Sequence, residues 1–84
     1  MMSIDEACEY VFNGWAPGVI SYELDGNTIH LVCKSNSGRS TYEGEVVIKD
    51  GGEHFSYGDP YGSNTPYIFG KNVCQMMTKG EITE

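Results

Sequence analysis

The sequence predicts an α+β fold, a two-layer sandwich of the order α-β-β-β-β-α. In it, a four-stranded antiparallel meander carries an N-terminal and a C-terminal helix on one face. Three observations predict this. Near both ends of the chain, apolar residues recur at steps of three and four, which is typical of amphipathic helices. Between Val19 and Gly58, apolar and polar residues alternate instead, which indicates strands with one buried face. The connections between these strands are short, so antiparallel neighbours within one domain, residues 1–84, are expected.

The first helix is expected from Ile4 to about Asn13. Ser3 and Glu6 have the spacing of a capping box, in which each side chain accepts a hydrogen bond from the other residue's backbone amide. Gly14 is the expected left-handed cap at the C-terminal end. The apolar stripe of this helix consists of Ile4, Ala7, Cys8, Val11, Phe12 and Trp15.

Four strands are expected near residues 19–25, 28–34, 41–49 and 54–58. We place Gly26 and Asn27 at the centre of the first turn, because Gly in the first central position suits a type II′ turn. Gly51 and Gly52 are expected at the tip of the last hairpin. These turns set a register in which the facing pairs are apolar. The pairs are Leu24–Ile29, Tyr22–Leu31, Ile20–Cys33, Ile48–Phe55 and Val46–Tyr57.

The second helix is expected from Pro66 to about Lys79, with Thr65 as its cap and Gly80 at its end. Gly70 allows this helix to approach a neighbour closely. Gly44, in the middle of the apolar sheet face, is expected to leave a hollow for Trp15 or Phe12. The residues expected to face the core are Ile4, Cys8, Val11, Phe12, Trp15, Ile20, Tyr22, Ile29, Leu31, Val46, Ile48, Phe55, Phe69, Val73 and Met77.

Composition limits the classes of function. Twelve acidic residues against five basic ones give a net charge of -7, which repels nucleic acid and anionic membranes and favours a basic partner. The start of the chain lacks the basic and apolar regions of a signal peptide, and its apolar runs are far too short to span a membrane. Cys8, Cys33 and Cys74 are odd in number and widely spaced, which indicates reduced, buried thiols in a cytoplasmic protein.

The strand register predicts that Glu23, His30 and Glu45 lie side by side on the polar sheet face. One interpretation is a small-ligand or metal-dependent site, since imidazole and carboxylates serve as metal ligands and as acid–base groups. The other, which we favour, is cross-strand charge pairing, because a flat solvated surface excludes no water. The connection 35–40 contains several serines and one arginine, but it lacks the spacing of a phosphate-binding loop.

The segment 57–67 is the part of the chain that folding explains least. It contains three tyrosines and two prolines between the last strand and the last helix. Tyr supplies rigid contact area and Pro restrains the backbone, so this composition suits a protein-binding loop. The alternative is a structural loop whose rings cover the edge of the sheet. Asp59 and Tyr61 are the candidates within it.

Taken together, these features favour a small non-enzymatic interaction protein that binds a basic surface of a larger protein, with no cofactor. No catalytic or cofactor motif accompanies the acidic charge. In size and acidity the chain is similar to small phage or mobile-element inhibitors, and this resemblance implies an inhibitor that mimics nucleic acid. The expected partner-binding residues are Glu23, Asp25, Glu43, Glu45, Asp59 and Tyr61. A structural or assembly protein is a further alternative, and the oligomeric state stays open.

Overall fold

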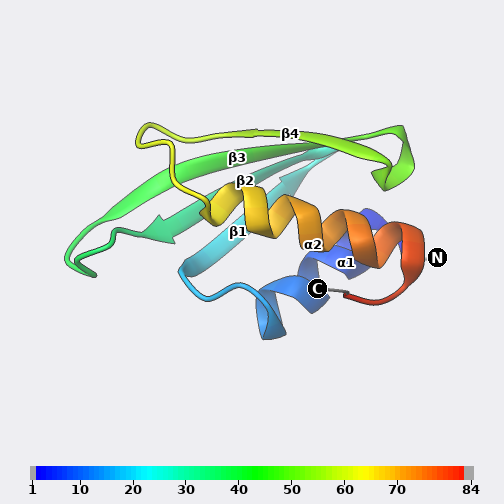
Figure 1. The fold of residues 1–84 in the computed structure, drawn as a ribbon, viewed down its shortest axis with the longest axis horizontal. Coiled ribbons are helices and arrows are strands. Elements are labelled where there is room, and N and C mark those ends of the chain that lie inside the picture. Colours follow the sequence, from blue (N-terminus) through cyan, green and yellow to red (C-terminus); the bar gives the residue numbers. More distant parts are fainter. Residues whose placement is uncertain (1, 83–84) are drawn as a thin grey trace.

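The computed structural model describes residues 2–82, and these form the expected two-layer α+β fold. Its elements are α1 (Ile4–Gly14), β1 (Val19–Asp25), β2 (Thr28–Lys34), β3 (Thr41–Lys49), the 3₁₀ turn η1 (Asp50–Gly52), β4 (His54–Gly58) and α2 (Thr65–Lys79). The strands form one antiparallel sheet in the order β1-β2-β3-β4. Both helices lie on one face of it: α2 packs over β3 and β4, and α1 packs against α2 and β1 (Figure 1).

The capping box that starts α1 is confirmed. The Ser3 hydroxyl accepts a hydrogen bond from the Glu6 amide at 3.2 Å, and Glu6 accepts one from the Ser3 amide at 3.3 Å. The expected left-handed cap at Gly14 is wrong. The helix continues through Gly14 and ends at Trp15, whose φ is -136° and whose amide donates to the Val11 carbonyl at 2.7 Å. The helix therefore ends with a hydrogen bond to the Val11 carbonyl and without a left-handed residue.

The register of the first hairpin is as expected near the turn and shifts at its far end. Gly26 has a φ of +62°, as a type II′ turn requires, and the pairs Leu24–Ile29 and Tyr22–Leu31 are present. Beyond them, an irregularity between Val19 and Ser21 makes Val19, rather than Ile20, the partner of Cys33. The extra residue of a bulge is left unpaired, and Ile20 is 42% exposed, so its predicted core position is wrong.

The helix α2 approaches the sheet at two glycines. A Cβ atom on Gly44 of β3 would lie 2.7 Å from Cγ of Pro66, so the hollow over this glycine is filled by Pro66 rather than by the expected Trp15 or Phe12. On the helix side, a Cβ on Gly70 would lie 2.6 Å from the Phe55 ring and 2.9 Å from Val46. Neither position has room for a side chain, so each glycine sets the distance between helix and sheet.

The ends of α2 differ slightly from expectation. The cap is Asn64, whose side chain makes no capping hydrogen bond, and Thr65 is the first helical residue instead of the cap. Pro66 occupies the first turn, where its missing N–H costs nothing. Gly80 ends the helix in the left-handed conformation, with a φ of +72° and its amide bonded to the Met76 carbonyl, as predicted.

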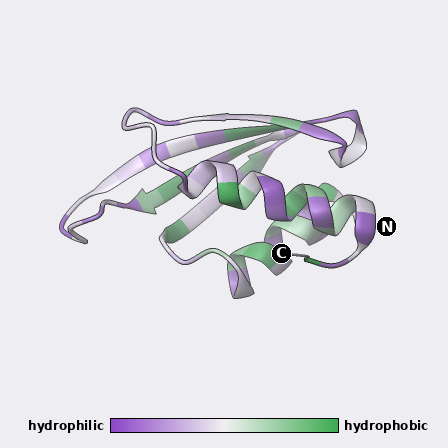
Figure 2. Ribbon diagram, viewed as in Figure 1, coloured by the Kyte–Doolittle hydropathy of each residue, from purple (hydrophilic) through white to green (hydrophobic). Residues whose placement is uncertain are grey.

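The core lies between the sheet and the two helices, and Figure 2 shows hydrophobic and hydrophilic residues alternating along the strands and along α2. Of the predicted core residues, Trp15 and Ile20 are exposed, and the others are buried or half-buried. Trp15 leaves the core because α1 ends there with a non-helical φ that carries its side chain off the apolar stripe. The predicted core list lacks five hydrophobic residues that the structure buries: Ala7, Cys33, Tyr42, Cys74 and Met76. Of these, Ala7 was expected in the apolar stripe of the first helix, and Cys33 and Cys74 were expected as buried thiols.

Two helical glycines test this packing, because they have opposite surroundings. Gly70→Ala gains about 1 kcal/mol of helix propensity but must displace Val46, which is fully buried, so we expect a net loss of about 1–2 kcal/mol in the free energy of unfolding. Gly14→Ala meets nothing within 4 Å and should leave stability unchanged or raise it by up to about 1 kcal/mol. Urea unfolding of both variants measures the difference, and an equally stable Gly70→Ala protein would contradict the close contact.

Candidate functional site

The face of the sheet that no helix covers carries four of the predicted partner-binding residues. The register pairs Glu23 with His30 and His30 with Glu45, so this row crosses β1, β2 and β3 as expected. Glu43 lies opposite Val32, and Asp25 lies opposite Thr28 at the end of β1. All four carboxylates are exposed. We call Glu23, Asp25, Glu43 and Glu45 the acidic sheet face.

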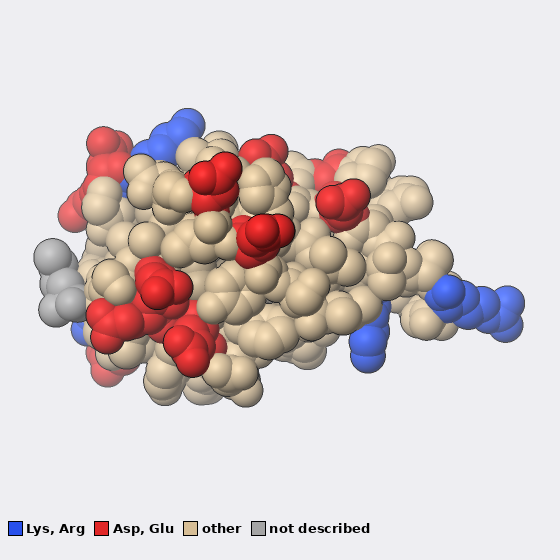
Figure 3. All heavy atoms as spheres, turned by 180° about the vertical axis from the view of Figure 1, so that it is seen from behind, with Lys and Arg blue, Asp and Glu red and all other residues tan. Residues whose placement is uncertain are grey.

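Acidic side chains dominate this side of the molecule. In Figure 3, which views the structure from behind, Asp and Glu are spread across the visible surface, whereas Lys and Arg lie at its edges. Lys34 and Lys49 occupy the ends of β2 and β3, at either end of the acidic sheet face. Among residues 2–82, the single ion pair within 4.0 Å joins His54 and Asp50, so neither lysine neutralises these carboxylates by direct contact. This face therefore presents its carboxylates to solvent.

The row of Glu23, His30 and Glu45 is brought together by the register, but its geometry is open. A shallow depression of about 230 Å³ lies beside it, lined by Glu23, His30 and Glu43. Within the described part of the chain, no three His, Cys, Asp or Glu side chains are grouped closely enough to hold a metal ion. The row thus has the composition of a ligand site without the convergence of ligands that a metal centre requires.

The Tyr-rich loop is organised around Asp59. Its carboxylate accepts hydrogen bonds from the Tyr61 amide at 2.8 Å, from the Ser63 amide at 3.0 Å and from the Ser63 hydroxyl at 3.1 Å. Burial by itself would raise the pKa of Asp59, but these bonds, with one from the Gly62 amide, outweigh it and lower the pKa below its usual value. The carboxylate of Asp59 therefore shapes the loop, and it has less capacity left for a partner than the carboxylates of the sheet face.

Tyr61 is 73% exposed and lies on the other side of the sheet from the acidic face. Its ring packs edge-on against Tyr42, with 5.3 Å between ring centroids. Tyr42 is a buried residue of the helix-bearing face, and its hydroxyl bonds Ser63 at 2.6 Å. The structure therefore divides the six predicted residues into two surfaces: four carboxylates on the open face, and Asp59 with Tyr61 in the loop.

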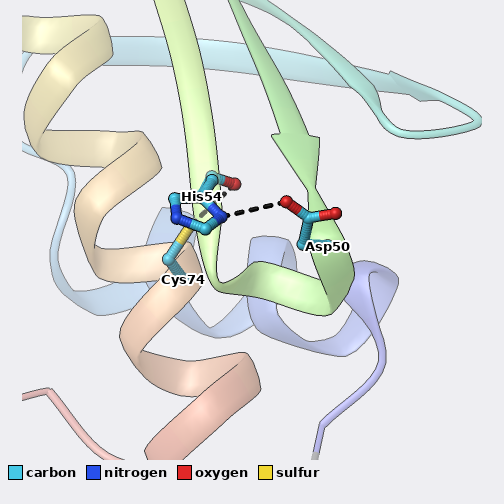
Figure 4. A network of polar contacts seen from close by, with 3 residues as sticks. All are labelled: Asp50, His54 and Cys74. Atoms are coloured by element: carbon cyan, nitrogen blue, oxygen red, sulfur yellow. Dashed lines mark hydrogen bonds and ion pairs between the residues drawn. The ribbon is translucent and has the colours of Figure 1, made fainter.

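Cys74, His54 and Asp50 have the composition of a nucleophile with an acid–base pair, but they lack its geometry (Figure 4). His54 Nδ1 lies 2.9 Å from Asp50 Oδ2. The Cys74 thiol, however, contacts the backbone carbonyl of His54 at 3.9 Å rather than its imidazole. Burial raises the pKa of Cys74 to about 11, whereas a reactive cysteine has a lowered pKa. This cluster closes the turn between β3 and β4 and does not form an activated thiolate.

The remaining cysteines are buried and unpaired, as the sequence indicated. Burial, with a smaller contribution from Asp5, raises the pKa of Cys8 to about 12. Burial also raises the pKa of Cys33. All three thiols therefore stay protonated and act as small apolar core residues.

The exposure of two aromatic residues near α1 was not predicted from the sequence. Tyr10 and Trp15 of the α1 region are each about half exposed, at 48% and 46%. The two other tyrosines of the segment 57–67, Tyr57 and Tyr67, lie against each other and against Phe55, with ring centroids 5.2–5.9 Å apart, between β4 and α2. The exposure of Tyr10 could have been predicted, because Tyr10 lies outside the apolar stripe of its helix.

Comparisons with known proteins give no relative: no family model, no curated protein and no solved structure matches this chain. Within residues 2–82, no helix has both the length and the apolar character to cross a membrane. The candidate surfaces must therefore be interpreted from their own chemistry.

The role of Asp59 predicts a pH dependence. Because its pKa in the folded protein lies below the ordinary value of 3.8, the ionised carboxylate stabilises the fold above that pH. This contribution is lost as the pH falls through the lower folded-state pKa. Between about pH 5 and about pH 2, the free energy of unfolding should therefore fall more steeply in the wild type than in Asp59→Asn.

The measurement is denaturant unfolding of both proteins at a series of pH values. Asp25→Asn is the matched control, because it makes the same chemical change at an exposed residue of the sheet, outside the loop that Asp59 organises. Parallel profiles for Asp59→Asn and the wild type would show that the loop does not depend on the ionised carboxylate.

Proposed function

We propose that this protein is a small, cytoplasmic, non-enzymatic interaction module that uses its acidic sheet face to bind a basic surface of a larger protein. The observation that carries the proposal is the uncovered sheet face with its four exposed carboxylates. Two helices cover the opposite face, so the fold itself does not use this surface. We propose further that the partner binds nucleic acid and that the carboxylates partly mimic it, as in small phage or mobile-element inhibitors.

The spacing of the carboxylates supports this proposal. Residues two apart on a strand are separated by about 7 Å, and neighbouring strands by about 4.8 Å. Glu43 and Glu45 of β3 and Glu23 and Asp25 of β1 therefore form two short rows of negative charge, with β2 between them. A rigid sheet holds these rows in fixed positions, so little conformational entropy is lost when basic side chains bind.

Charge balance also favours a basic partner. The net charge of -7 leaves the isolated protein with unrelieved repulsion between like charges. A partner that brings Lys and Arg to the sheet face relieves this repulsion, whereas nucleic acid or an anionic membrane increases it. The protonated, buried thiols suit a reducing compartment, which supports the cytoplasmic assignment.

A second candidate is a small-ligand or metal-dependent site at the row of Glu23, His30 and Glu45, favoured by the depression of about 230 Å³ beside it. A melting temperature that rises with Zn²⁺ in the wild type and not in His30→Ala would favour this alternative. An assembly role through a free sheet edge is the third, and size-exclusion chromatography distinguishes it from the other two.

The acidic face predicts a specific kinetic effect. The variant Glu43→Lys with Glu45→Lys should associate with the partner about tenfold or more slowly, because surface charges act mainly on the association rate. The wild-type rate should fall as salt rises. The partner is first captured from a lysate of the native cell and identified by mass spectrometry, and its association with each variant is then measured by surface plasmon resonance.

The matched control is Glu53→Lys with Glu81→Lys, which makes the same change in net charge with two exposed residues away from the acidic sheet face. The control should retain most of the wild-type association rate. A rate that responds neither to salt nor to the substitutions on β3 would contradict the proposal, and an equal effect of both variants would show that net charge alone, rather than this face, controls association.

A further inference from the structure

The outer side of α1 carries two large aromatic residues that the fold does not bury. Tyr10 and Trp15 are 48% and 46% exposed. The core-facing side of the same helix is formed by Ala7, Cys8 and Val11, which are fully buried, so Tyr10 and Trp15 are not needed to fill the core. Aromatic side chains gain more free energy from burial than most other side chains, and two half-exposed rings lose part of that gain. This exposure is the feature that needs a functional explanation.

These rings line an open groove of about 570 Å³ along α1. Met2 and Asn13 contribute to its wall, and Glu6 and Glu9 bring two carboxylates to it. One oxygen of Glu6 serves the capping box at Ser3, and Glu9 lies one turn further along the helix. We call this surface the α1 groove. It combines apolar ring surface with negative charge, and α1 has no basic residue in its last turn to neutralise that charge.

This combination matches one kind of occupant. A cation is attracted both to the face of an aromatic ring and to a nearby carboxylate. The arginine guanidinium suits both contacts best, because it is planar, stacks on rings and bonds carboxylates with two parallel N–H groups. We propose that the α1 groove binds an arginine side chain from a basic segment of the partner protein, an inference that rests on the proposed function in taking the partner to be basic.

Other occupants fit the groove less well. An apolar surface would desolvate Glu6 and Glu9 without giving them partners, which costs free energy. A second copy of the chain would bring another acidic α1 against this one, and nucleic acid or an anionic membrane would add further negative charge. The arginine side chain is therefore the occupant that the charge of the groove favours. The α1 groove and the acidic sheet face are separate surfaces, one on α1 and one on the strands, and each attracts positive charge.

The test uses Trp15, which is the sole tryptophan of the chain and therefore reports on the groove by its fluorescence. The full chain is titrated with a capped hexa-arginine peptide, and separately with hexalysine and hexaglutamate peptides. Hexa-arginine should change the emission of Trp15 saturably, with a midpoint severalfold below that of hexalysine. Hexaglutamate should produce no change.

Variants locate the binding site. Tyr10→Ala and Glu9→Gln should each raise the hexa-arginine midpoint about two- to fivefold, as expected for loss of one cation–π contact or one surface charge pair. Glu53→Gln is the matched control for Glu9→Gln and should leave the midpoint unchanged. Thermal melts of each variant establish that it is folded. Glu9→Gln removes only one charge from an exposed residue, so it keeps the test valid if Tyr10→Ala does not fold.

The variant Glu43→Lys with Glu45→Lys separates this inference from the proposed function. A hexa-arginine midpoint equal to that of the wild type in this variant, together with a raised midpoint in Glu9→Gln, supports binding at the groove. This result would hold even if the sheet-face proposal were wrong. No saturable change of Trp15 emission with hexa-arginine would overturn the inference. So would a midpoint that depends on Glu43 and Glu45 but not on Glu9 or Tyr10, because the peptide would then bind the sheet face.

Discussion

The close contact between α2 and the sheet, made at Gly44 and Gly70, is the constraint on which the rest of the structure depends. Pro66 of α2 lies where a side chain on Gly44 would be, and Phe55 and Val46 of the sheet lie where a side chain on Gly70 would be. A helix and a sheet that approach this closely bury Phe69, Val73 and Met76 almost completely. A domain of 84 residues buries a smaller share of its surface than a larger domain does, so it depends on dense packing of this kind.

This arrangement also determines which surfaces stay open. Because α2 covers β3 and β4, and α1 occupies the remaining space beside β1, both helices use the same face of the sheet (Figure 1). The opposite face is left to solvent with its carboxylates fixed on a rigid support. The outer side of α1 is also left open, with its exposed Tyr10 and Trp15. Both surfaces that we propose for binding are open because the two helices and the whole core lie on one face of the sheet.

Most of the fold could be predicted from the sequence, because local signals determine it. The spacing of apolar residues predicted the helices and strands. The turns at Gly26 and Gly51 predicted the register of two hairpins, correctly for the apolar pairs nearest each turn. The errors arose where tertiary geometry decides. The bulge at Ile20 and the end of α1 at Trp15 place these two apolar residues outside the core. No local sequence pattern predicts the bulge or the position of the helix end. That Pro66 is the residue packed over Gly44 could not be predicted, because it depends on how α2 crosses the sheet. The four sheet carboxylates could be grouped from register alone, but Tyr61 could not be placed on the opposite side without knowing that it packs against Tyr42.

Native-state hydrogen exchange tests the dependence of the structure on this contact most directly. If α2 and the sheet are held together as one unit, the hydrogen-bonded amides of α2 from Val73 to Met76 should exchange only by global unfolding. Their free energies of opening should then equal those of the central amides of β3 and the unfolding free energy measured with denaturant. Amides of α2 that open at a free energy well below those of β3, while the sheet stays protected, would show that the sheet is stable without the helix and would contradict the account.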